Sequence, residues 1–228
     1  MTKTSETSAA QWQLLAKNDW GEILTLSEKK AFQRKFQIVN VFKDLVATQG
    51  VYNVSHIELA KKCKISRQLL EHHFPSRTDL VLLTYRYVFA KLQKTAADAL
   101  VTKKSFLEQF KGYIDSCAEW TQSHRSDALF VIQFYAVSST DPKLFALYNR
   151  NRLMGQERMA ALLLKGQAEG LPTKRSKDQL LNYASSIQKL IIGFAVQNSV
   201  SELTKVQLDR ETAELWRSTL GIVGIFKE

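Results

Sequence analysis

Three consecutive side chains after Ser66 have the chemistry to recognise the edges of base pairs. Arg67 carries a planar guanidinium that can bond to both O6 and N7 of guanine, and Gln68 can bond in the same way to N6 and N7 of adenine. The apolar Leu69 can contact the methyl group of thymine. Each good pair of bonds discriminates between bases by about 1–3 kcal/mol. These residues are candidates for DNA sequence recognition if one helix presents them together.

The surrounding pattern predicts three helices that would present them. Apolar residues recur every three or four positions over residues 28–48, after Ser27 as a possible N-cap and before Gly50 as a stop. Two short helices follow, each after a serine that can cap it. This order is typical of a helix-turn-helix, whose last helix enters the major groove, although three small helices of any bundle fit the same residues. The short helices are expected from Ser55 to about Lys62 and from about Arg67 to His73.

The positive charge of the chain gathers in the same stretch. The net charge is +10 over 228 residues. Residues 29–80 hold ten basic and four acidic side chains, whereas residues 1–28 hold two basic and four acidic ones. A concentration of this kind is expected of a module that binds phosphates. A solvated basic surface without a partner gives the same count.

The sequence argues against several other classes of protein. Nine glycines and three prolines are too few for the many turns of a β-sandwich, so we expect an all-α fold. The two cysteines, Cys63 and Cys117, lie far apart and outside any zinc-binding spacing. No GxGxxG, Walker A, HExxH or GxSxG motif occurs. We therefore expect no enzyme, no metal and no cofactor.

Nothing in the sequence points to a membrane or to secretion. The first twelve residues contain no apolar run like that of a secretory signal. The longest apolar stretches fall far short of the roughly 20 residues that cross a bilayer. We expect a cytoplasmic protein that does not enter a membrane.

The spacing of residues between about Phe36 and Leu83 matches a known pattern without a gap. The matching positions are Gly50, Ser55, Leu59-Ala60, Ile65-Ser66, Leu70, Phe74, Ser76-Arg77 and Leu80. In these positions the sequence resembles the TetR family of bacterial transcription regulators. The resemblance implies an N-terminal DNA-binding domain and a larger helical C-terminal domain that dimerises and often binds a small effector.

Some positions depart from the family's pattern. Lys64 stands where the family usually has the glycine of the turn, so a residue with a Cβ must adopt a conformation that suits glycine. Glu71 replaces a tyrosine that usually touches phosphate, and His56-Ile57 inverts the usual order of apolar and polar residues. The Glu71 carboxylate can accept a bond from cytosine or, more simply, pair with Arg67 one turn earlier.

The resemblance also implies contacts that position the protein on DNA. His73 and Arg77 fall where the family contacts phosphates, and the Ser55 hydroxyl lies at a helix N-terminus, which attracts anions. His72 is a further candidate for a DNA contact. A neighbouring pair of histidines on a helix points in directions about 100° apart, so either ring can instead pack.

The C-terminal two thirds keep the helical period with few breaks. The last two predicted helices carry apolar residues on more than one face and small residues such as Gly193, which would let another helix approach closely. In the resembled family such a pair forms the dimer interface, although burial within one chain would also explain it. Helices are expected at about residues 79–101, 105–122, 126–138, 142–169, 177–200 and 208–226.

An effector pocket is harder to place from sequence. Six residues combine apolar walls with a few polar groups, as ligand sites do, although an aromatic stripe at helical spacing also fits a plain core. These candidates are Trp120, Gln133, Phe134, Tyr148, Asn149 and Arg152.

Together these features predict a DNA-binding transcriptional regulator, in the repressing sense usual for the resembled family, that responds to a small molecule. We expect an extension at residues 1–27, a helix-turn-helix domain at 28–80 and an effector-binding and dimerisation domain at 81–228. A homodimer formed through residues 177–200 and 208–226 would read a palindromic operator in double-stranded DNA. The alternative is a helical dimerisation or partner-binding protein whose DNA-binding module has drifted and binds DNA weakly or without sequence preference.

Overall fold

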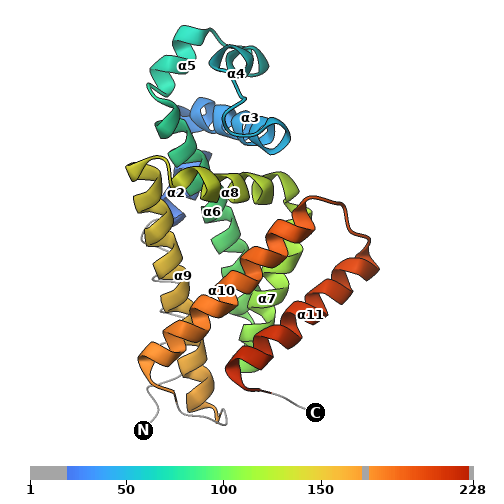
Figure 1. Ribbon diagram of the computed structural model, residues 1–228. Helices are drawn as coiled ribbons and strands as arrows, with labels where there is room; N and C mark the ends of the chain where they lie inside the picture. Colours follow the sequence, from blue (N-terminus) through green and yellow to red (C-terminus); the bar gives the residue numbers. More distant parts are fainter. Residues whose placement is uncertain (1–19, 171–174, 226–228) are drawn as a thin grey trace. The chain divides into compact units, whose positions relative to one another are not determined.

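The computed structural model describes residues 20–170 and 175–225, and these residues form helices without strands (Figure 1). The prediction of an all-α fold is therefore confirmed for the part of the chain that is described. The helices are α2 (Trp20–Glu28), η1 (Lys30–Phe32), α3 (Gln33–Gln49), α4 (His56–Lys62), α5 (Arg67–His73), α6 (Arg77–Val101), α7 (Phe106–Ser123), α8 (Arg125–Ser138), α9 (Pro142–Ala168), α10 (Lys177–Ser199) and α11 (Lys205–Val223). None of them is long and apolar enough to cross a membrane.

The start of the first predicted helix is wrong. Ser27 does not cap a helix beginning at residue 28, because it lies inside α2 and its hydroxyl donates to the carbonyl oxygen of Leu24 at 2.6 Å. Burial of Trp20 and Ile23 favours a helix over this earlier segment, and α3 begins only after the turn η1. Residues 1–19 of the predicted extension lie outside the described residues.

The described helices pack into two compact units. Residues 20–93 and 124–149 make up the first, called here the N-terminal unit, and residues 94–123 and 150–225 make up the C-terminal unit. The helices α6 and α9 contribute residues to both. These units follow packing, whereas the predicted division at residues 28 and 81 concerns function and stays a prediction.

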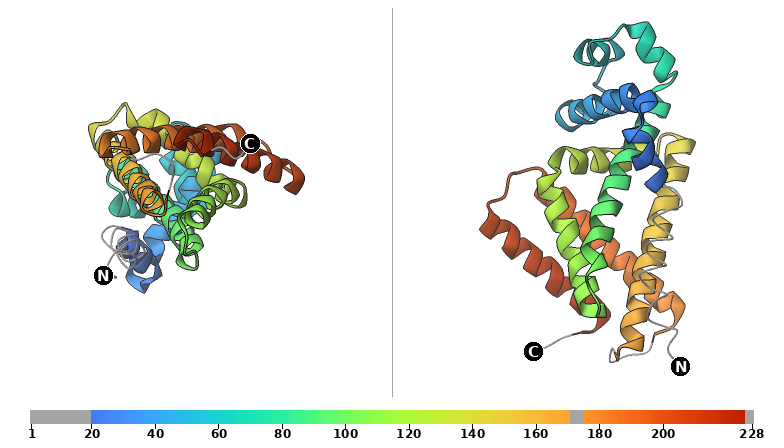
Figure 2. Two further views of the ribbon diagram at one scale, coloured as in Figure 1. Left: turned by 90° about the horizontal axis from the view of Figure 1, so that it is seen from below. Right: turned by 180° about the vertical axis from the view of Figure 1, so that it is seen from behind.

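In the N-terminal unit, α8 packs along α3, as Figures 1 and 2 show. Aromatic rings of α8 pack on two helices: Phe130 meets Phe42 of α3 edge-on at 6.3 Å between centroids, and Phe134 stacks on Tyr85 of α6 at 3.6 Å. Because these rings are almost fully buried, α8 supplies the apolar support on which α3 rests.

Polar side chains of α8 fix its position against α3. The Gln133 amide donates to the carbonyl oxygen of Val46 at 2.7 Å and accepts from the Val51 N–H at 2.8 Å. Asp127, 2% exposed, forms ion pairs with Lys43, at 2.6 Å, and with Lys91. Burial alone would lower the pKa of Lys43, but its bonds to Asp127 and Asp44 raise the pKa above its ordinary value. Lys43 therefore stays a cation that holds α3 to α8.

In the C-terminal unit, α7, α10 and α11 pack against one another. Capping boxes begin α10 at Ser176–Gln179 and α11 at Thr204–Gln207. The capping box places the start of α11 at Lys205, three residues before the predicted start at 208. The helix ends at Val223 with Gly224 in the left-handed conformation, and the predicted end at 226 lies outside the described residues.

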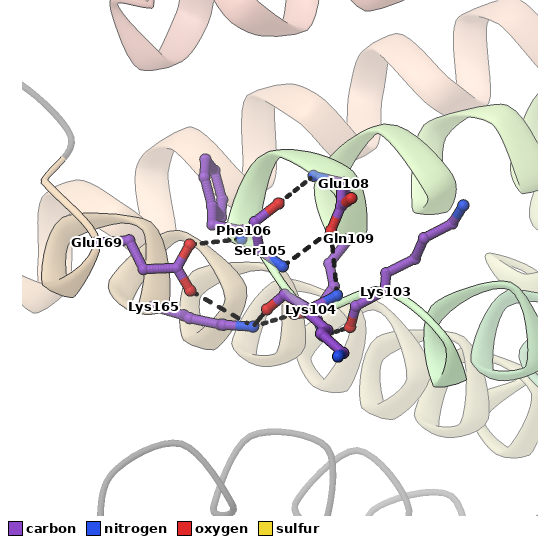
Figure 3. A network of polar contacts seen from close by, with 8 residues as sticks. All are labelled: Lys103, Lys104, Ser105, Phe106, Glu108, Gln109, Lys165 and Glu169. Carbon is purple, nitrogen blue, oxygen red and sulfur yellow. Dashed lines mark hydrogen bonds and ion pairs between the residues drawn. The ribbon is translucent and has the colours of Figure 1, made fainter.

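Side chains at the start of α7 and at the C-terminal end of α9 bind the backbone N–H groups where α7 begins (Figure 3). Ser105 and Glu108 form a reciprocal cap, with the Glu108 N–H donating to Ser105 Oγ at 3.3 Å and the Ser105 N–H to the Glu108 carboxylate at 3.0 Å. Glu169, which directly follows α9, accepts from the Phe106 N–H at 2.6 Å, and Lys165 of α9 donates to Gln109 at 2.9 Å. These bonds fix where α7 begins.

Candidate nucleic-acid interface

Helices α4 and α5 begin and end close to where the sequence predicts. The hydroxyl of Ser55 accepts from the Glu58 N–H and that of Ser66 from the Leu69 N–H, both at 3.1 Å. Leu70 has no exposed surface and is the one buried residue of α5. With Leu70 as its anchor, α5 leaves Arg67, Gln68 and Leu69 exposed at its N-terminal end.

The turn between α4 and α5 uses Lys64 in place of a glycine. Its φ of 53° makes it the one non-glycine residue with positive φ in the described chain. The Lys64 N–H donates to the carbonyl of Lys61 at 3.1 Å and the Ile65 N–H to that of Ala60 at 3.0 Å. These two bonds form a Schellman motif, which requires the left-handed conformation at this position. The expectation of a glycine-like backbone at Lys64 is therefore confirmed.

Arg67 and Glu71 form the ion pair expected one helical turn apart. Arg67 Nε donates to Glu71 Oε1 at 2.7 Å, and the two side chains are 64% and 47% exposed. Such an exposed pair contributes little to stability. It does orient the arginine, because the bond uses Nε and leaves both terminal nitrogens for another partner.

Two histidines lie at the C-terminal end of α5, near the α3 cations Arg34 and Lys35. The rings of His72 and His73 are 5.7 Å apart between centroids, with His72 exposed and His73 half-buried. Burial lowers the pKa of His73, and the charges of His72, Lys35 and Arg34 lower it further. The imidazole is therefore neutral near pH 7 and can donate one hydrogen bond to a phosphate.

Arg34 and Lys35 were not singled out in the sequence, although both contribute to the charge of residues 29–80. They belong to α3, and the tertiary fold brings this helix close to the end of α5, where Lys35 Nζ lies 5.9 Å from the Phe74 ring. No local spacing relates these residues to His73. The charge count alone could have indicated them.

Arg77, predicted to contact phosphate, lies half-buried and bonds within the protein. Its Nη2 donates to the carbonyl oxygen of Val51, and its guanidinium lies 5.8 Å from the centre of the Phe42 ring. Burial lowers the pKa of Arg77 from its ordinary value. This side chain ties the start of α6 to the loop that precedes α4, and a phosphate contact by it stays a prediction.

The six predicted effector residues belong to different units and take part in packing. In the N-terminal unit, Gln133 bonds to the backbone near α3, Phe134 stacks on Tyr85, and Tyr148 meets Tyr135 edge-on. Asn149 lies half-buried in the same unit. In the C-terminal unit, Trp120 is buried and Arg152 donates to Gln156 at 3.4 Å. Three hollows described for this structure are lined by other residues.

Solved structures share this fold. A protein from Saccharomonospora viridis assigned as a transcriptional regulator, solved with choline, is 21% identical, with a TM-score of 0.69 over 83% of this chain and 96% of that one. A TetR-family regulatory protein from Rhodococcus has 14% identity, a TM-score of 0.69, and coverage of 85% and 98%. A ketosteroid transcriptional regulator from Mycobacterium tuberculosis has 18% identity, a TM-score of 0.65, and coverage of 86% and 96%. The chain therefore has the fold of TetR-type regulators.

Comparison of the sequence alone gives no such relation. No family model matches the chain, and the comparison with curated proteins gives no match. The fold likeness rests on the arrangement of helices rather than on shared residues.

Replacing Lys64 by glycine is expected to stabilise the protein by about 1 kcal/mol, because a side chain in the left-handed conformation is strained there. Chemical denaturation of both proteins measures the difference. The Lys64→Ala variant is the control, since it removes the charge but keeps the Cβ. Equal stabilisation by alanine and glycine would show that the charge, and not the backbone, is responsible.

Replacing Arg77 by alanine is expected to destabilise the protein by about 1–3 kcal/mol in the absence of DNA, because the Val51 carbonyl loses its partner. Denaturation of the free protein measures this loss. Arg67→Ala is the matched control, because that arginine is exposed and pairs with Glu71 on the surface. Comparable stabilities for the two variants would contradict a structural role for Arg77.

Proposed function

We propose that the protein is a sequence-specific DNA-binding transcriptional regulator of the TetR type. The observation that carries the proposal is the start of α5, where Arg67, Gln68 and Leu69 are all exposed and the next residue, Leu70, is buried. Arg67 can donate two hydrogen bonds to guanine, Gln68 can form two with adenine, and Leu69 can contact the methyl group of thymine. A short helix held in this way after a second helix and a tight turn suits entry into the major groove.

The charges around α5 support the same proposal. The exposed cations of α3 and α4 supply attraction to phosphates, while the side chains at the start of α5 supply recognition. His73 and Ser55 add hydrogen-bond donors, and His72 is exposed beside them. Apart from Lys43, which pairs with Asp127, the basic residues in and next to α3 and α4 are Lys29, Lys30, Arg34, Lys35, Lys61, Lys62 and Lys64.

A homodimer formed through α10 and α11 completes the proposal. Several of their apolar residues stay partly exposed, including Val196 at 43%, and the missing side chain of Gly193 leaves open space. A second copy packed on these helices would cover them, and its two-fold axis would pair two α5 helices on a palindromic site.

A small-molecule effector that relieves repression is the final element. The Saccharomonospora viridis protein of the same fold was solved with choline, and hollows of about 500 Å³ occur in the C-terminal unit. Pockets of this size hold small ligands. A bound effector would bias the protein toward a conformation with lower affinity for DNA.

One observation favours the alternative of a partner-binding protein with a drifted DNA-binding module. The carboxylate of Glu71 is 47% exposed on α5, the helix that would approach phosphates. Repulsion there opposes DNA binding unless Arg67 keeps the charge paired. The two functions differ in whether the protein prefers one DNA sequence.

Selection of duplexes from random DNA by the purified protein tests the proposal. We expect one palindromic sequence to be enriched and its affinity to fall by about 10³-fold or more between 50 and 200 mM salt, as for proteins with several phosphate contacts. Electrophoretic mobility shift at each salt concentration measures this. Binding without preference for any duplex would support the alternative function.

The Arg67→Ala variant is expected to relax specificity at one base position by about 1–3 kcal/mol, because its guanidinium would no longer bond to a guanine. Competition among single-base variants of the selected site measures the change. Arg34→Ala serves as the control and should weaken every sequence alike while reducing the salt slope by about one. A sequence-independent loss from both variants would show that Arg67 does not read bases.

A further inference from the structure

A hollow of about 500 Å³ lies between α7 and α11 in the C-terminal unit. Its apolar walls come from Leu107 on α7, Trp216 and Leu220 on α11, and Ile225 beyond α11. Trp216 packs edge-on against Phe110 of α7, with ring centroids 5.2 Å apart, so the aromatic floor is held in place. The predicted effector residues do not line this hollow, which we call the α7–α11 groove.

The charged residues of the groove are unequal in what they offer a ligand. Glu108 is turned back onto the start of α7, where its carboxylate accepts from the N–H groups of Lys104 and Ser105 at 3.2 and 3.0 Å (Figure 3). These bonds lower the pKa of Glu108, so it stays ionised but directed at its own backbone. The Glu108 carboxylate is therefore hydrogen-bonded to the backbone at the start of α7 and is not directed at a ligand in the groove.

The two cations of the groove, Lys111 and Arg217, differ in whether they already have an acidic partner. Lys111 pairs with Asp115 at 2.7 Å, and its Nζ lies 5.9 Å from the centre of the Trp216 ring. Arg217 is exposed at the rim and has no acidic partner among the residues that the structure describes. A guanidinium can bind a carboxylate through two parallel hydrogen bonds. The groove thus combines an apolar floor with one cation that lacks a counter-charge.

We propose that the α7–α11 groove binds a small carboxylate with an apolar body, whose acid group pairs with Arg217 and whose body lies on Trp216 and Leu220. The volume fits a ligand of drug-like or smaller size, and a mostly apolar lining with few polar groups is usual for such sites. A cationic ligand would meet Lys111 and Arg217, and a neutral one would leave Arg217 unused. This assignment rests on the proposed function, because it names a ligand class for one of the hollows offered there for an effector, but its binding can be measured without DNA.

Calorimetric titration of the full-length protein with decanoate tests the site. One decanoate per chain should bind, and decanol and decyltrimethylammonium, whose alkyl chains are only one carbon longer, should bind at least about tenfold more weakly. Replacing Arg217 by glutamine should weaken decanoate about tenfold and leave decanol unchanged, because only the charge contact is lost. Arg210→Gln, on the same helix but outside the groove, is the matched control and should change neither affinity.

A second variant, Leu107→Glu, places a charge in the apolar lining of the groove. Leu107 is 46% exposed, so Leu107→Glu should leave the fold intact, as circular dichroism can verify, while placing a charge in the groove and abolishing decanoate binding. The control is Val206→Glu, at a residue that is 79% exposed and outside the groove. This variant should leave the decanoate affinity unchanged.

Three results would overturn the proposal. Equal binding of the three alkyl probes would show that the groove does not select an anion. Unchanged decanoate affinity in Arg217→Gln would place the acid group elsewhere. Absence of decanoate binding, together with a change in sedimentation caused by Leu107→Glu, would show that a second copy of the chain covers the groove. None of these results depends on whether the protein binds DNA, so failure of the site and failure of the regulatory function are distinguishable.

Discussion

The presentation of α5 depends on the burial of one side chain, Leu70. A helix of seven residues is too short to be stable in water by itself, so α5 forms because it is capped by Ser66 and anchored by Leu70. At 100° per residue, Gln68 and His72 lie on the side of the helix opposite Leu70. The same burial that stabilises α5 thus turns Gln68 and His72 outward.

The support beneath this arrangement comes from α8, a helix distant in sequence. Its aromatic residues fill the contact with α3, while Gln133 bonds to the backbone on both sides of the α3 C-terminus. Asp127 is buried between two lysines, where removal of one partner would leave an uncompensated charge. The N-terminal unit is therefore more than three helices, because its rigidity requires residues some 80 positions further along the chain.

The candidate ligand site shows why residue type alone does not locate a pocket. Phe134 and Trp120 are aromatic and Gln133 is polar, as a ligand site would need, but the fold uses all three for packing or backbone bonding. Leu107 and Arg217 lie more than a hundred residues apart and line one groove. Whether a side chain packs in the interior or borders a hollow depends on which helix faces it, and no local pattern contains that information.

Much of the secondary structure, including the start of α5 at Arg67, followed from the sequence, because caps, helical periodicity and the positive φ at Lys64 are local properties. The serine caps at Ser55 and Ser66 act within three residues, and so their helices could be placed closely. The start of α3, the inward turn of Arg77 and the nearness of Arg34 and Lys35 to His73 required the tertiary structure. These features arise when segments distant in sequence compete for the same buried space, and burial is a property of the whole fold rather than of any one segment.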